Sequence, residues 1–184
     1  VNDGESDALI GEMLDHYYEI QAGIGAHKSP ELYGAVPTDP YSHTPATKGA
    51  QQPGMTGQVK EEILSRFGEL GIHVLQGKVE FKPKLLRSRE FLVDEKPFRF
   101  LDVNNVWQET MVPKNGIGFT WCQIPIVYEL CDDKSELVLT LSDGNQVRTD
   151  ELMLVGEYTD ALFNRTGSIK KIHITLNISQ LLCD

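Results

Sequence analysis

Residues 171–178 read Lys-Ile-His-Ile-Thr-Leu-Asn-Ile and indicate the fold class of the C-terminal part of the chain. Apolar and polar residues alternate there without a break. Because successive side chains of a β-strand point to opposite faces, this alternation predicts a strand with one buried face. The side chains expected to point inward are those of Ile172, Ile174, Leu176 and Ile178.

Further strands are predicted upstream of this one, back to Gly71. Gln76-Gly77 separates residues 73–75 from residues 78–81 and is typical of a hairpin turn. Pro125 indicates an edge or a bulge. Short strands at near-regular spacing predict an antiparallel β-sandwich over residues 71–184. The remaining strands are expected at residues 99–106, 119–130, 137–141 and 152–155.

The N-terminal part has a different pattern. Apolar residues recur every three or four positions in residues 6–21 and 56–70, which predicts two amphipathic helices. The loop between them, residues 23–57, holds five of the nine prolines and is longer than most loops of compact domains. The expected fold class is therefore α+β, with a helix–long loop–helix segment (1–70) followed by the sandwich (71–184).

Composition excludes some classes of partner. The 184 residues carry a net charge of −10, which argues against a nucleic-acid or anionic-membrane surface. No apolar run approaches the roughly 20 residues of a transmembrane helix. The three cysteines lack metal-binding spacing, and Cys122 is expected to be a buried core residue of a strand.

The long loop concentrates side chains suited to a hydroxyl-rich ligand. Carboxylate, phenol, imidazole and amide groups donate and accept hydrogen bonds, and aromatic faces pack on sugar C–H groups. The alternative is that these residues only form turns. The candidate substrate-binding residues are Tyr33, Asp39, Tyr41, His43, Gln51 and Gln52.

Two other groups of residues are candidates for a site. Glu61 and Glu62 are candidate catalytic carboxylates, although acids at a helix N-terminus are also favoured by the helix dipole. Trp107 is the better candidate for a sugar-stacking surface, because Trp121 lies in an apolar strand. A metal site from His27, Asp39 and His43 lacks diagnostic spacing, so no metal or cofactor is expected.

Three segments resemble the C-terminal part of large bacterial glycoside hydrolase-like or phosphorylase-like proteins. They are residues 33–45 (YGAVPTDPYSHTP), residues 49–61 (GAQQPGMTGQVKE) and residues 81–86 (FKPKLL). Proteins of that kind have an (α/α)6 toroid followed by a small β-sandwich. The resemblance implies that the loop lines a sugar or phosphate pocket and that the central catalytic acid lies outside this chain.

The resemblance also implies partners and a setting. An upstream helical domain or another chain would pack on the N-terminal helices, and a carbohydrate would be the ligand. A soluble protein of the bacterial cytoplasm or periplasm is expected. The alternative function is a non-catalytic carbohydrate-binding or protein-interaction module that uses the sandwich near Trp107.

Overall fold

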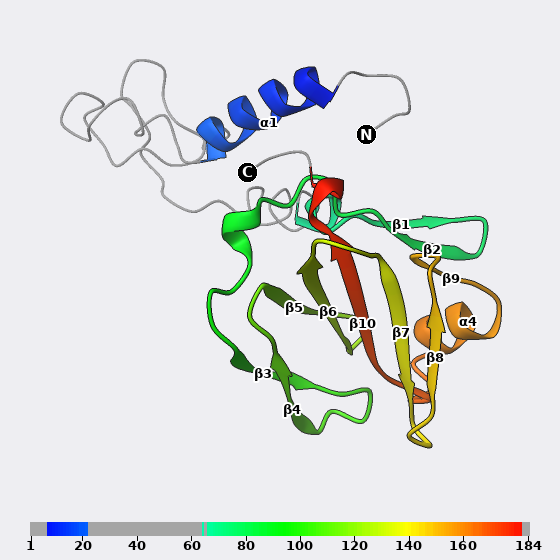
Figure 1. Cartoon of the computed structure of the whole chain (residues 1–184). Coiled ribbons are helices and arrows are strands. Elements are labelled where there is room, and N and C mark those ends of the chain that lie inside the picture. The colour runs from blue at the N-terminus through cyan, green and yellow to red at the C-terminus, as the bar shows by residue number, and fades with distance from the viewer. Residues whose placement is uncertain (1–6, 22–63, 65, 182–184) are drawn as a thin grey trace, which may run out of the picture. The chain divides into compact units, whose positions relative to one another are not determined.

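The computed structural model describes residues 7–21, 64 and 66–181 (Figure 1). The chain divides into two compact units, residues 1–68 and residues 69–184. In the first unit, α1 spans Asp7–Gln21, where the sequence predicts the first helix. Leu64 and residues 66–69 are helical, inside the second predicted helix. The loop 23–57 and the rest of that helix lie outside the described residues.

The second unit consists mainly of strands, with few helices. Two short 3-10 helices, η2 and η3, span Ser88–Glu90 and Ile178–Gln180, and one α-helix, α4, spans Glu157–Phe163. The strands are β1 (Ile72–Leu75), β2 (Lys78–Phe81), β3 (Lys96–Leu101), β4 (Trp107–Val112), β5 (Gly116–Trp121), β6 (Ile124–Cys131), β7 (Glu136–Leu141), β8 (Gln146–Thr149), β9 (Met153–Leu154) and β10 (Ile169–Asn177).

These strands form three sheets. The largest has the order β5-β6-β10-β7-β8, and Figure 1 shows β10 between β6 and β7. A second sheet has the order β1-β2-β9, and β3 and β4 form a two-stranded hairpin. Neighbouring strands are antiparallel except for β6 and β10, which are parallel. The predicted predominance of antiparallel strands is confirmed, and the parallel pair is the departure from it.

The apolar face of β10 forms the centre of the core. Ile172, Ile174 and Leu176 are fully buried, and the cross-strand register places Ile174 beside Tyr128 and Leu137. Phe81 of β2 meets the ring of Tyr128 edge-on, with 6.4 Å between ring centroids. The three-stranded sheet therefore packs against this face of the five-stranded one.

The opposite face of the five-stranded sheet is covered in part by the β3–β4 hairpin. An added Cβ at Gly118 would lie 2.6 Å from a methyl group of Val112 and 3.5 Å from the ring of Phe98. The missing side chain of Gly118 lets the hairpin approach β5 closely. Phe98 and Phe100 stack at 5.8 Å on the side of the hairpin that faces the sheet.

Two of the predicted strands are in fact interrupted by turns. Within residues 99–106, β3 ends at Leu101 and the chain then turns through residues 102–105, where Asn105 has a φ of 58°. The segment 119–130 turns at Cys122 and Gln123, which have φ values of 49° and 64°. Asp and Asn favour turns, whereas Cys-Gln has no such signal. The prediction that Cys122 is a buried strand residue is therefore wrong, because Cys122 is a half-buried turn residue.

Other details of the strand predictions also differ. The predicted alternation in 171–178 is confirmed for Ile172, Ile174 and Leu176, but Ile178 begins η3 and is 41% exposed. Pro125 lies in an interior strand rather than an edge. It is tolerated because it pairs with Thr120 of β5, while the pairing with β10 starts only at Ile126. The strands β4 and β8 and the helix α4 were not predicted.

The hydroxyl of Tyr128 connects the core to the start of the second unit. It donates a 2.7 Å hydrogen bond to the backbone carbonyl of Leu70, and the ring is fully buried. Burial raises the pKa of the Tyr128 hydroxyl above its ordinary value, so this hydroxyl keeps its proton and remains a donor.

The variant Tyr128→Phe should lower the free energy of unfolding by about 1–3 kcal/mol, because the Leu70 carbonyl loses its buried donor. Urea denaturation of the 184-residue chain measures the change. The control is Tyr158→Phe at a half-exposed position of α4, where we expect a change within about 0.5 kcal/mol. Equal effects of the two variants would contradict the role given to the Tyr128 hydrogen bond.

Candidate functional site

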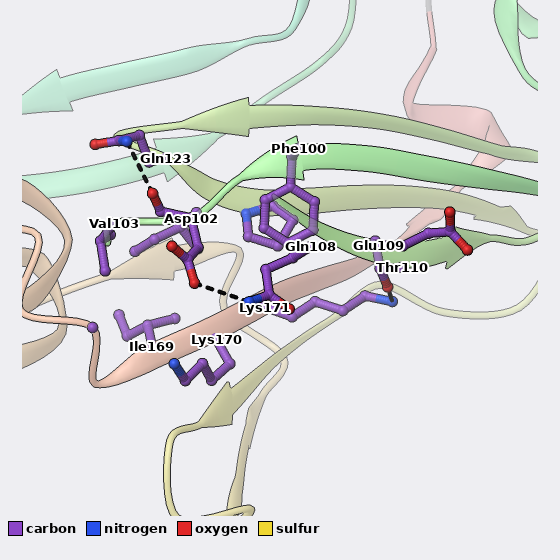
Figure 2. Close-up of a pocket in the computed structure, with 13 residues that line it drawn as sticks. Phe100, Asp102, Val103, Gln108, Glu109, Thr110, Gln123, Ile169, Lys170 and Lys171 are labelled. Atoms are coloured by element: carbon purple, nitrogen blue, oxygen red, sulfur yellow. Dashed lines mark hydrogen bonds between the residues drawn. The ribbon is translucent and has the colours of Figure 1, made fainter. Parts of the chain in front are cut away.

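A pocket of about 290 Å³ lies between the β3–β4 hairpin, the β5–β6 turn and the start of β10 (Figure 2). Segments far apart in the sequence meet there. The lining residues with most bearing on its chemistry are Phe100, Asp102, Gln108, Thr110, Gln123 and Lys171.

Asp102 shapes the hairpin loop that borders the pocket. Its Oδ1 accepts the backbone N–H of Asn104 at 2.9 Å and that of Val106 at 3.0 Å, and its Oδ2 accepts Nε2 of Gln108 at 3.2 Å. The N–H of Val106 lowers the pKa of Asp102 most, and the donors of Asn104 and Gln108 lower it further. Asp102 is therefore ionised and holds the hairpin loop in its conformation, and one of its carboxylate oxygens faces the pocket.

Gln123 ties the β5–β6 turn to the same loop. Its Nε2 donates to the backbone carbonyl of Asp102 at 3.0 Å and to Oδ1 of Asn105 at 3.2 Å. Figure 2 shows the bond to Asp102 at one end of the pocket. The positive φ of Gln123 follows from the tight turn that brings its side chain to the hairpin loop.

A bulge at the start of β10 brings two lysines to the pocket. The register with β7 shifts between Ile169 and Lys171, so Lys170 is the extra residue. In a regular strand, Lys170 and Lys171 would point to opposite faces, whereas at this bulge both line the pocket. The Nζ of Lys171 donates to Oγ1 of Thr110 at 3.2 Å, and burial lowers its pKa.

Next along β10, His173 contacts Glu129 of β6. The His173 Nε2 lies 2.8 Å from a Glu129 carboxylate oxygen, but this buried nitrogen makes no well-aligned hydrogen bond with any residue in the described part of the chain. Burial lowers the pKa of His173, and the attraction of Glu129 opposes that shift only in part. The pair therefore contributes a neutral imidazole beside a carboxylate on the same polar face as Lys171.

The residues predicted from the loop and from the start of the second helix fall outside the described part of the chain. This holds for the catalytic candidates Glu61 and Glu62, and for the binding candidates Tyr33, Asp39, Tyr41, His43, Gln51 and Gln52. They stay predictions.

The two tryptophans lie in described strands. Trp107 is 61% exposed, with the Arg99 guanidinium 5.3 Å from the centre of its ring, while Trp121 is half-buried. Trp107 is therefore available at the surface of the hairpin. It belongs to the strand that carries Gln108 and Thr110, two of the residues that line the pocket.

The pocket residues were not predicted from the sequence. Residues 102–105 carry one usable signal, since Asp102, Asn104 and Asn105 are typical turn residues. No sequence signal connects this run to Gln123 or Lys171, because their meeting depends on the pairing of β6 with β10.

Within residues 7–21, 64 and 66–181, no three His, Cys, Asp or Glu side chains lie close enough together to hold a metal ion. Over the same residues, no helix is sufficiently long and apolar to cross a membrane. The sequence matches no known family model, and no curated protein matches it.

Proposed function

We propose that this chain is the C-terminal portion of a carbohydrate-active protein of the glycoside hydrolase or phosphorylase kind. It contributes a substrate-lining loop, residues 23–57, and a β-sandwich that packs on the rest of the protein. The observation that carries the proposal is the resemblance of residues 33–45, 49–61 and 81–86 to such proteins. The catalytic acid would come from a part of the protein outside this chain.

The exposure of an apolar side chain on α1 supports the proposal. Met13, on its apolar stripe, is 65% exposed. A soluble helix normally buries such a side chain against a neighbour, so this helix fits a role as one of the last helices of a larger helical domain.

A second candidate function is a carbohydrate-binding module on the hairpin. The exposed ring of Trp107 favours it, because sugars pack their C–H groups against such rings. The two functions share the ligand class and differ in the residues that contact the sugar.

In the complete protein that contains this chain, Tyr41→Phe should lower kcat/KM for its glycoside substrate by about five- to tenfold. The reason is the loss of one hydrogen bond between the loop and a sugar hydroxyl. Steady-state kinetics measure the effect, and Tyr158→Phe in α4 is the matched control, which should leave kcat/KM unchanged.

The same experiment separates the two functions. Unchanged kinetics in Tyr41→Phe, together with loss of glycan binding in Trp107→Ala, would favour the binding module. A complete protein without activity on any glycoside would contradict the first function altogether.

A further inference from the structure

We propose that the pocket between the β3–β4 hairpin and β10 binds one neutral sugar ring, as a site separate from the long loop. The inference rests on the proposed function for the ligand class, because that function makes a carbohydrate the ligand of this protein. The location and the kind of sugar follow from the pocket itself.

Size limits the ligand to about one ring. At about 290 Å³ the pocket lies at the lower end of the range for small-molecule sites, which is roughly 300–1,000 Å³. The pocket is partly open to solvent, so a ring could enter while its substituents or a second ring stay outside.

The polar groups of the pocket match the mixed donors and acceptors of sugar hydroxyls. Lys171 uses one of its three N–H bonds on Thr110, and the other two make no hydrogen bond to another of the described residues. The Thr110 hydroxyl accepts that bond and still has its own hydrogen to donate. Asp102 Oδ2 and the side-chain oxygen of Gln108, two further lining residues, supply acceptors.

These groups are held in place before a ligand arrives. Asp102 is fixed by three donors, and Gln123 locks the loop to the β5–β6 turn. Thr110 holds the Lys171 side chain across the pocket, and Figure 2 shows that side chain extending toward Thr110. A preorganised set of polar groups lowers the entropy cost of binding.

The pocket also has apolar lining residues that suit the C–H groups of a sugar ring. The ring of Phe100 lines the pocket, together with Pro125 and Ile169. The C–H faces of a sugar ring pack favourably on aromatic rings, whereas its hydroxyls point sideways to hydrogen-bonding partners. The pocket offers both kinds of surface.

The charges of the lining residues favour a neutral sugar over an acidic one. Two acidic residues, Asp102 and Glu109, line the pocket with two basic residues, Lys170 and Lys171, so their formal charges cancel. An anion would gain little net attraction here and would lie beside the ionised Asp102.

The test is an NMR titration of the ¹⁵N-labelled 184-residue chain with D-glucose, D-galactose and D-mannose. The acidic probes D-glucuronate and glucose 6-phosphate are titrated in parallel. We expect a saturable shift of the Thr110 and Lys171 amides with at least one neutral sugar and weaker binding of the acidic probes.

Lys171→Met should weaken that binding about tenfold or more, since a hydrogen bond from a charged donor is lost. Lys114→Met is the matched control, because Lys114 is an exposed lysine away from the pocket, and it should bind as the unaltered chain does. If Lys171→Met does not fold, Lys171→Gln is titrated instead. The amide shift changes of the unaltered chain still show where the sugar binds.

Three results would overturn the inference. They are the absence of any saturable shift at the pocket amides, tighter binding of the acidic probes, and equal affinities of Lys171→Met and Lys114→Met. Shifts confined to residues 23–57 would refute this pocket and leave the proposed function intact. A complete protein that is inactive on glycosides, yet binds a neutral sugar here, would instead refute the proposed enzyme function and retain the pocket.

Discussion

Replacing Gly71 with alanine is expected to destabilise the second unit by about 3 kcal/mol or more. Gly71 has a φ of +66°, where an L-residue loses about 1–2 kcal/mol. In addition, a Cβ there would collide with the backbone carbonyl of Lys82 and the nitrogen of Pro83. The Lys82 N–H also donates to the Gly71 carbonyl at 2.7 Å, so the two backbones cannot separate without losing that bond.

Gly77→Ala is the matched control for this effect. Gly77 has a similar φ of +73°, but an added Cβ there meets nothing within 4 Å. We expect a loss of about 1–2 kcal/mol from the backbone conformation alone. Urea denaturation of both variants measures the difference. A Gly71 variant no less stable than the Gly77 variant would show that the close approach to Lys82 and Pro83 carries no energetic weight.

Ile174→Ala is expected to lower the free energy of unfolding by about 2–5 kcal/mol. Ile174 is fully buried in the middle of β10, between Tyr128 of β6 and Leu137 of β7. Removal of three carbon atoms there loses transfer free energy and leaves a cavity between strands that are paired on both sides. The loss of stability should be close to about 5 kcal/mol if the neighbouring side chains cannot move into the cavity.

The comparison for Ile174 is Ile178→Ala, four residues further along. Ile178 begins η3 and is 41% exposed, so its truncation should cost less than about 1 kcal/mol. Denaturation curves monitored by tryptophan fluorescence give both values, since Trp107 and Trp121 lie in the same unit. Similar losses for the two isoleucines would contradict the placement of β10 at the centre of the sheet.

Much of the fold could be predicted from local patterns. The strands β1, β2, β7 and β10 follow from alternation and from the Gln76-Gly77 turn, where both residues have positive φ. The turns at residues 102–105 and 122–123 were not predicted, for different reasons. The first has turn residues inside a run whose other residues favour a strand, and the second places Cys and Gln in a conformation usually adopted by Gly or Asn.

The candidate site could not be predicted in the same way. Thr110 and Lys171 are 61 residues apart and form a hydrogen bond only because the hairpin lies over the start of β10. The bulge that turns both Lys170 and Lys171 toward the pocket is a property of the pairing with β7, and neither residue type signals it.

The amino-acid pattern alone indicates the strands β1, β2, β7 and β10 and the apolar face of β10. These features are local, because they depend on the spacing of side chains along one segment. The position of β10 between β6 and β7, parallel to the first and antiparallel to the second, is set by contacts between distant segments. That choice depends on burying the Ile172–Leu176 face on both neighbours at once, and it is also what places Lys171 opposite Thr110 and creates the pocket.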